Sequence, residues 1–396
     1  MVFNSLGSNY TFSFAMKALF GGGNKADQIK LEKYLADRYS GKVTLLYKGR
    51  EAIALALKVL NFSKGSCVAI NGYTCYAVYQ PIAEAGLKTE YLDIAENSLH
   101  FSARELSAAV ENNPSIKAVI IQNTLGYACD IEGISEVCRQ RNVFLIEDLA
   151  HSVGAVYKNG REAGSFGDFV ILSFSQDKII DAVSGGALIV RNKKYMDVPL
   201  PVLSSVNLKH RLKDRFYPNF TYKIRKEYAI GLGKLQHKFL KALGWLSQPM
   251  GTSEKIVLRK LPAWQCRLAL GCFMDLDKNI AHRKSIAQTY QNNLGPNIAK
   301  VYSADKIVLS TNLRFPILVK NREGLISYLK NYGIHISDIW YDAPVAPAKY
   351  TDKSSYNHDC PKAENVSREM LNLPTHINVS QKQAEGICYL INTWFR

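Results

Sequence analysis

Two residues that could take part in catalysis end short segments in the first half of the chain. Asp148 ends the apolar segment VFLIED, and thirty residues later Lys178 ends SFSQDK, with a glycine pair at 185 and 186. A lysine amine can form a Schiff base with the aldehyde of pyridoxal phosphate (PLP). A carboxylate can keep the pyridine nitrogen of PLP protonated, so that the ring acts as an electron sink. The pair therefore indicates a PLP enzyme in which Lys178 is the catalytic residue.

Short apolar segments alternate with helical patterns between residues 43 and 191. Their spacing leaves room for one crossover helix between successive strands. The predicted strands are residues 66–71, 88–94, 117–123, 142–148, 168–174 and 186–191. Apolar strands at this spacing are typical of a mostly parallel sheet that is covered by helices on both faces. The sequence therefore predicts an α/β fold for this part of the chain.

Polar residues stand at or near the ends of three of these predicted strands, at Asn123, Asp148 and Ser173. Ligands of parallel sheets bind at the carboxyl ends of the strands, so these three side chains could face one site. Taken alone, Asp148 could equally cap a helix or stand in a surface turn. Its combination with Lys178 favours the functional interpretation.

Length, charge and cysteine content limit the classes of protein that fit. The chain has 396 residues, enough for roughly two or three domains, and 47% of them are hydrophobic, as in ordinary globular proteins. The net charge of +16 favours a polyanionic partner such as a nucleotide, a nucleic acid or an anionic membrane. The eight cysteines form no CxxC pair, so no metal site is predicted and reduced thiols are expected. Without a signal peptide or a long apolar segment, we expect a cytoplasmic protein.

A strongly basic insertion without strand alternation occupies residues 192–260. Its part from residue 207 onward contains thirteen Lys or Arg residues and three acidic ones. Apolar residues recur there at helical spacing with lysines between them, at Leu232, Leu235, Phe239, Leu243 and Leu246. This pattern predicts an amphipathic basic helix. Such a helix could pack on the protein or across a dimer, or it could contact an anionic membrane surface.

The chain is predicted to divide into a large domain, residues 1–260, and a smaller C-terminal α/β domain, residues 261–396. The smaller domain begins with a long predicted helix and contains two strands and a last helix. These elements are expected at residues 261–290, 314–319, 334–338 and 380–395.

Six segments in the same order resemble the DegT-type sugar aminotransferases, a family of fold-type I PLP-dependent enzymes. They are residues 47–57, 71–78, 146–155, 164–178, 184–190 and 360–376. The resemblance covers most of residues 40–192 and resumes near residue 261. It implies a PLP-binding large domain with a mostly parallel central sheet, a smaller C-terminal domain, and a homodimer with shared active sites.

The resemblance also assigns roles to individual residues. It implies that Lys178 is the Schiff-base lysine, that Asp148 pairs with the pyridine nitrogen and that Ser173 binds the cofactor phosphate. His151 stands where the family often has Gln and would lie on the side of the ring hydroxyl. After Thr74 the family commonly has an aromatic residue that stacks on the pyridine ring. This chain has Cys75 followed by Tyr76 there, so which of the two covers the ring is open.

A predicted helix begins near Gly49 and Arg50, in the segment GREAIALALKVL. The backbone N–H groups of its first turn could hold the cofactor phosphate at the positive end of the helix dipole. A glycine before a helix is also commonly only a turn. Arg50 replaces the Thr or Ser that is frequent in the family, and it could bind either the phosphate or a nucleotide.

The resemblance implies an aminotransferase that moves an amino group from an amino acid, glutamate in similar enzymes, to a nucleotide-linked keto-sugar. Such sugars enter polysaccharide, lipopolysaccharide or natural-product glycans. Lys178 separates this chain from related sugar dehydratases, in which a His replaces the lysine. No nucleic acid partner is expected for such an enzyme. The alternative is a catalytically silent relative that binds nucleic acid or an anionic membrane.

Overall fold

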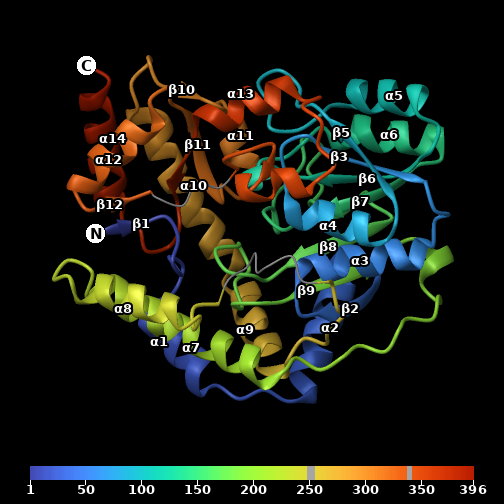
Figure 1. The fold of residues 1–396 in the computed structure, drawn as a ribbon, viewed down its shortest axis with the longest axis horizontal. Helices are drawn as coiled ribbons and strands as arrows, with labels where there is room; N and C mark the ends of the chain where they lie inside the picture. Colours follow the sequence, from blue (N-terminus) through green and yellow to red (C-terminus); the bar gives the residue numbers. More distant parts are fainter. Residues whose placement is uncertain (248–254, 337–340) are drawn as a thin grey trace.

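A seven-stranded sheet organises the first half of the chain in the computed structural model, which describes residues 1–247, 255–336 and 341–396 (Figure 1). The strand order is β2-β9-β8-β7-β6-β3-β5. Within this sheet β9 runs in the direction opposite to the other six strands. The strands are β2 (Lys42–Leu46), β3 (Cys67–Asn71), β5 (Lys88–Leu92), β6 (Ile116–Gln122), β7 (Phe144–Asp148), β8 (Phe169–Ser173) and β9 (Gly186–Val190).

Helices cover both faces of this sheet, as the apolar strands require. In β6, Ala118 and Ile120 face one hydrophobic cluster, whereas Val119 and Ile121 face the other. The first cluster is closed by α3 (Gly49–Leu60) and α4 (Tyr76–Glu84). The second is closed by α2 (Lys25–Tyr39), α5 (Ala103–Asn112), α6 (Ile131–Arg141) and α9 (Ala263–Met274). The predicted α/β class with a mostly parallel sheet is confirmed.

All six predicted strands of the sheet are present, each within two residues of its expected bounds. The expectation of a crossover helix between every pair was wrong after β7 and after β8, and β2 was not predicted. Strand β9 returns antiparallel to β8, a connection that needs no crossover helix. The segment between β7 and β8 is held by the buried carboxylate of Glu147. It accepts hydrogen bonds from the backbone N–H groups of Gly164 (2.7 Å), Phe166 (2.7 Å) and Gly167 (2.5 Å).

A second sheet lies in the C-terminal part and consists of three antiparallel strands, β10 (Ala299–Lys300), β11 (Arg314–Leu318) and β14 (Met370–Pro374). Its helices are α10 (Leu276–Asn293), α11 (Ala304–Leu309), α12 (Arg322–Asn331), α13 (Pro361–Glu369) and α14 (Gln381–Trp394). The single long helix expected over residues 261–290 was wrong, because Asp275 leaves helical geometry (φ −94°, ψ 7°) and separates α9 from α10.

Two short strand pairs connect distant parts of the sequence. Strand β1 (Val2–Phe3) pairs with β12 (Ile334–His335), and β4 (Thr74–Cys75) pairs with β13 (Val345–Ala346). The last residues of the strand predicted at 334–338 lie outside the described residues. The described residues also form three short 3-10 helices, η1 (Thr124–Gly126), η2 (Lys193–Tyr195) and η3 (Ala348–Lys353). The division into domains at residue 260 stays a prediction.

The basic insertion forms two helices, α7 (Leu208–Lys226) and α8 (Leu232–Ala242), while residues 248–254 of it lie outside the described residues. Helix α8 is the amphipathic helix predicted from the sequence, but it ends at Ala242, so Leu243 caps it and Leu246 lies beyond its end. Helix α1 (Phe12–Phe20) packs along α7 at the bottom of Figure 1. None of the described helices is long and apolar enough to cross a bilayer.

Helix α7 is fixed to the rest of the protein by a buried carboxylate, Asp214. The hydroxyls of Tyr47 (2.6 Å) and Ser247 (2.8 Å) donate to it, and so does the side-chain amide of Gln265 (3.3 Å). Tyr47 lies just before Lys48, the N-cap residue of α3. The hydrogen bond from Tyr47 to Asp214 therefore attaches the insertion next to the start of α3.

Candidate active site

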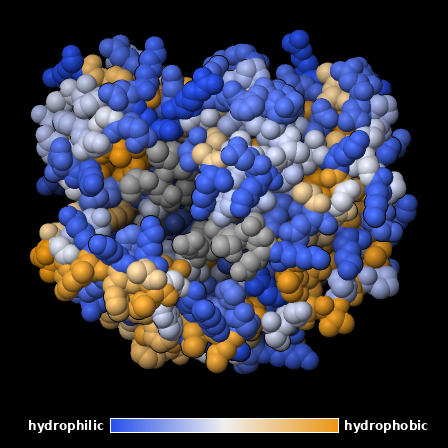
Figure 2. Space-filling model, in the orientation of Figure 1, coloured by the Kyte–Doolittle hydropathy of each residue, from blue (hydrophilic) through white to orange (hydrophobic). Residues whose placement is uncertain are grey.

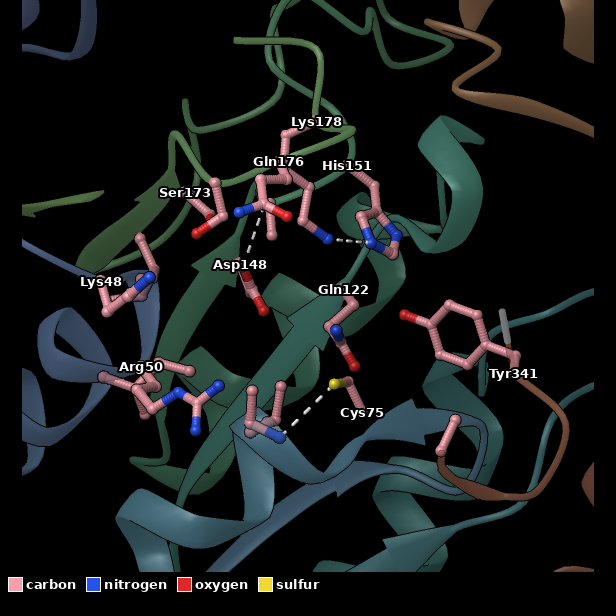
Figure 3. Close-up of a pocket in the computed structure, with 18 of the residues that line it drawn as sticks. Lys48, Arg50, Cys75, Gln122, Asp148, His151, Ser173, Gln176, Lys178 and Tyr341 are labelled. Carbon is pink, nitrogen blue, oxygen red and sulfur yellow. Dashed lines mark hydrogen bonds between the residues drawn. The ribbon is translucent and has the colours of Figure 1, made fainter. Parts of the chain in front are cut away.

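A pocket of about 410 Å³ lies at the carboxyl ends of β6, β7 and β8, beside the start of α3 (Figure 3). The seven residues to which the sequence assigned a catalytic or cofactor-binding role all line it. They are Gly49, Arg50, Cys75, Asp148, His151, Ser173 and Lys178. Lys178 and Asp148 therefore face one cavity, as they must if both are to contact a single small ring.

Lys178 lies in the connection between β8 and β9, and its amine meets His151. The distance between Lys178 Nζ and His151 Nε2 is 2.8 Å. The backbone N–H of Leu125 donates to His151 Nδ1 (3.1 Å), so a neutral His151 carries its proton on Nε2 and donates it to the lysine amine. Burial lowers the pKa of Lys178 and the pKa of His151. Together these effects favour a neutral amine on Lys178.

The connection that carries Lys178 is held by the buried carboxylate of Asp181. It accepts hydrogen bonds from the backbone N–H of Asp177 (2.8 Å) and from the hydroxyl of Tyr10 (2.9 Å). The side chain of Asn9 donates to the carbonyl of Lys178 (3.2 Å). Burial, and then the charge of Asp177, raise the pKa of Asp181 to about 7. The N-terminal segment thus fixes the backbone at Lys178 through Asn9 and Tyr10.

Asp148 ends β7 beside Gln122, which ends β6 and pairs with it in the sheet register. The hydroxyl of Thr74 donates to the Gln122 side-chain oxygen, which leaves the amide nitrogen of Gln122 as a donor to Asp148. The backbone N–H of Ala150 also donates to Asp148 (3.0 Å). Burial raises the pKa of Asp148 to about 6, against these hydrogen bonds and the charge of Lys178. A cation in the pocket would lower that pKa again.

Asn123, the polar residue predicted at the end of the preceding strand, lies outside the pocket wall. Its side chain donates to Ser152 (3.3 Å) and Tyr157 (3.1 Å) within the protein interior. Successive side chains of a strand point to opposite faces, so Gln122 takes the position beside Asp148. Alternation within one strand does not fix the register with the next strand, so the sequence did not identify Gln122.

The start of α3 approaches β8 and β9 closely because two glycines allow it. A Cβ atom on Gly49 would lie 2.9 Å from Cβ of Ser173, and one on Gly186 would lie 2.8 Å from the nitrogen of Gly49. Lys48, the N-cap residue of α3, makes no side-chain hydrogen bond to the first N–H groups of the helix. These groups and the Ser173 hydroxyl therefore lie together at one end of the pocket.

Two cationic side chains stand at the same end, Lys48 and Arg50. Lys48 directly precedes α3 and donates to the hydroxyl of Ser184 (2.7 Å), while Arg50 donates to the side-chain oxygen of Gln80 (3.1 Å). Burial lowers the pKa of both groups. Helix N–H groups, a hydroxyl and two cations form a donor set that suits a phosphate group. Lys48 was not predicted, because no spacing or motif marks it.

Cys75 and Tyr76, the two residues that could cover the cofactor ring, lie in different places. Cys75 lines the pocket, whereas the ring of Tyr76 stacks on Tyr350 outside the wall, with centroids 4.9 Å apart and planes at 19°. A further aromatic residue in the wall is Tyr341, whose ring meets His151 edge-on at 5.8 Å. Tyr341 comes from the C-terminal part of the chain and was not predicted.

The fold is that of the fold-type I PLP-dependent transferases, with a lysine and a carboxylate at the carboxyl edge of a mostly parallel sheet. The model of the DegT/DnrJ/EryC1/StrS aminotransferase family matches residues 23–392, and the chain belongs to this family. The predicted family and the predicted class of enzyme, a PLP-dependent sugar aminotransferase, are therefore confirmed.

Individual relatives are distant but cover nearly the whole chain. GDP-perosamine synthase of Escherichia coli O157:H7 is 25% identical over 92% of this chain and 88% of its own length. A UDP-4-amino-4,6-dideoxy-N-acetyl-beta-L-altrosamine transaminase of Campylobacter jejuni is 24% identical over the same shares, 92% and 88%. The crystal structure of a family aminotransferase from Brucella abortus superposes with a TM-score of 0.72 at 19% identity, covering 96% of this chain and 94% of that one. That likeness supports the fold.

Proposed function

We propose that the protein transfers an amino group from an amino acid, glutamate in our proposal, to the keto group of a nucleotide-linked sugar. The observation that carries this proposal is the meeting of Lys178 and Asp148 in one buried pocket of an aminotransferase-family chain. The names of the relatives from E. coli and C. jejuni, which refer to GDP-linked and UDP-linked sugars, support the substrate class. The product would enter a polysaccharide, a lipopolysaccharide or another glycan.

The pocket fits PLP in size and in chemistry. Its volume of about 410 Å³ lies within the range of small-molecule sites. Lys178 would bind the aldehyde and Asp148 the pyridine nitrogen, with His151 on the side of the ring hydroxyl. The N–H groups of α3 and the hydroxyl of Ser173 would hold the phosphate. When bound, PLP supplies an electron sink for the α-carbon of the amino-acid donor.

Lys48 and Arg50 extend this phosphate site beyond what the family resemblance implies. Both side chains line the pocket beside the first turn of α3. Their positive charges would compensate the two negative charges of a phosphate in a largely desolvated position. We therefore propose that Lys48 is a cofactor-binding residue as well, while Cys75 forms part of the wall against the ring.

Lys178 is the group that would move the proton during transfer. It must be neutral to take a proton from the donor's α-carbon, and burial together with the Nε2–H of His151 favours that state. Asp148 would remain ionised beside a protonated ring nitrogen, because the positive charge there opposes the effect of burial on its pKa. Lys178 would thus move a proton at one end of the ring, while the carboxylate of Asp148 would stabilise the proton on the ring nitrogen at the other end.

Several finer features stay proposals that rest on the family. We propose a homodimer with shared active sites, a cytoplasmic location, and a division into domains at residue 260. The second hypothesis from the sequence, a silent binding protein, is not favoured, since both Lys178 and Asp148 are present and the relatives named above are enzymes.

A substrate screen combined with a substitution tests the proposed function. The PLP-loaded protein is first converted to its amino form with glutamate, and GDP-linked and UDP-linked keto-sugars are then added. A productive sugar restores the absorbance of the PLP form. Lys178→Ala should lose both that absorbance and turnover, whereas Lys234→Ala, on the exposed surface of α8, should keep both. Transamination by Lys178→Ala at the wild-type rate would refute the assignment.

A further inference from the structure

Helix α8 exposes an apolar face that nothing in the described part of the chain covers. Leu232, Leu235, Phe239 and Leu243 are 44%, 65%, 61% and 55% exposed. They recur at helical spacing and so form one stripe, which we call the α8 face. Figure 2 shows apolar side chains gathered at the lower left, where Figure 1 places α8. Exposed apolar patches of this kind mark interaction sites.

The α8 face is oriented away from the body of the protein. Gly233, on a flank of α8 beside the stripe, is buried, and a Cβ there would lie 2.1 Å from the carbonyl oxygen of Ile224 in α7. Close packing on α7 therefore uses the glycine side of the helix. The leucines and the phenylalanine are left for another partner.

The charged side chains on α8 itself are all basic, and the carboxylate of Glu227 just before the helix accepts a hydrogen bond from Gln236 (2.5 Å). Lys234, Lys238 and Lys241 of the same helix are exposed. The sequence from residue 228 to residue 253 contains no acidic residue. Trp245, which is 37% exposed, follows the helix, and its ring contacts those of Phe216 (6.3 Å) and Phe220 (6.5 Å). Trp245 thus packs against apolar rings and also reaches water, as aromatic residues do at the boundary between lipid and water.

We propose that the α8 face docks on an anionic lipid surface. Interfacial helices combine leucine and aromatic residues on one side with lysines on the other, and lipid phosphates attract the lysines. A second copy of the chain fits less well, because lysine is depleted in the cores of protein interfaces. A second copy would also carry the same net charge of +16 and the same acid-free segment. Charge complementarity therefore favours the membrane.

Docking through α8 leaves the proposed catalytic pocket intact. The pocket is lined by residues of the central sheet, of α3 and of the C-terminal part, and none of its lining residues in the described chain belongs to α8. Lipid binding and amino transfer can therefore be measured separately, and the membrane proposal does not depend on the identity of the sugar.

Sedimentation with lipid vesicles tests the proposal on the full-length holoenzyme. The vesicles contain phosphatidylglycerol and phosphatidylethanolamine in equal parts, and phosphatidylcholine vesicles serve as the neutral comparison. The wild-type protein should bind only the anionic vesicles. Raising the ionic strength from about 0.1 M to about 1 M, which shortens the screening length from about 10 Å to about 3 Å, should release it.

A double variant, Leu235→Ser with Phe239→Ser, should lower the vesicle partition coefficient at least about tenfold, because two large apolar side chains no longer enter the lipid. The matched control is Met274→Ser with Tyr389→Ser. It removes side chains that are 65% and 70% exposed on α9 and α14, and it should bind like the wild type. Both variants should keep amino-transfer activity in solution.

Two results would overturn the proposal. One is vesicle binding by the α8 double variant equal to that of the wild type. The other is a wild-type protein that does not bind the anionic vesicles. If light scattering then shows that the α8 double variant, unlike the wild type and the control, is a monomer and not a dimer, the α8 face is a subunit interface instead.

Discussion

The pocket and the α8 face both contain lysines, but these lysines stand in opposite environments. Lys48 and Lys178 lie in the pocket, and burial lowers the pKa of each. Lys234 and Lys238 on α8 are exposed to water. In the pocket, the chemistry of a lysine depends on the one or two atoms that it meets. On α8 the lysines act through their summed charge, which salt screens. Substitutions should therefore have large, specific effects in the pocket and small effects on α8.

The largest effect in this comparison is expected for the charge opposite Lys178. Asp148→Asn removes the anion that would keep the ring nitrogen protonated, so the single-turnover rate with glutamate should fall about a thousandfold. The rate is measured by the change in cofactor absorbance after rapid mixing. A variant that retains more than about a tenth of the wild-type rate would contradict the role proposed for Asp148.

Asp148→Asn should lower activity but raise the stability of the cofactor-free protein. The pKa of Asp148 is raised from 3.8 to about 6 in the folded protein. The folded state therefore binds this proton more tightly than the unfolded state, and the resulting stability is lost as the pH rises through 6. Asp148→Asn should thus raise the free energy of unfolding by about 1–3 kcal/mol at pH 8 and hardly change it at pH 4. Urea unfolding at the two pH values measures the difference, and a loss at pH 8 would be inconsistent with the raised pKa.

The next largest effect is expected for the phosphate end of the pocket. Lys48→Met should lower the affinity for PLP about 10- to 30-fold, because one charge-assisted bond to the phosphate is lost. The affinity for pyridoxal, which lacks the phosphate, should not change. Titration of the cofactor-free protein, followed by absorbance, measures both affinities. Lys238→Met on α8 is the matched control, and equal losses for PLP and pyridoxal in Lys48→Met would argue against a phosphate contact.

A smaller effect is expected for His151. Replacing it with Phe removes the N–H that donates to the neutral amine of Lys178, so the pKa of that amine should rise. The cofactor-free protein can capture PLP only through a neutral amine on Lys178. The pH profile of the capture rate should therefore shift upward by up to about one pH unit. The rate near pH 7 should then fall by no more than about tenfold. An unchanged pH profile would show that His151 does not set the state of the lysine.

The pocket could be predicted from the sequence to the extent that it is built from local patterns. Buried strands appear as short apolar segments, and the residues that end them lie at the ligand edge, which led to Asp148 and Ser173. The start of α3 followed from Gly49 in the same way. These predictions depend on residues that are neighbours in the sequence and in space.

The remaining features depend on contacts between distant segments, which no local pattern encodes. Tyr341 reaches the pocket from the C-terminal part, and Tyr10 fixes Asp181 across 171 positions of the chain. Helical spacing predicted the apolar stripe of α8, but periodicity does not tell what covers such a stripe. That the α8 face is exposed required the packing of α8 on α7.

The same change, lysine to methionine, can be made in both regions, and on α8 it should have the smallest effect of all. Lys238→Met should change the free energy of unfolding of the cofactor-free protein by less than about 0.5 kcal/mol, equally at pH 7 and pH 10. Lys48→Met should stabilise the protein at pH 7, because the folded state binds the proton of this buried lysine less tightly than the unfolded state does. That gain should shrink as the pH approaches the ordinary pKa of lysine, 10.5, since the unfolded chain then also loses its proton. Urea unfolding of both variants at the two pH values gives the slopes. Equal slopes would mean that burial is not what distinguishes the lysines of the pocket from those of α8.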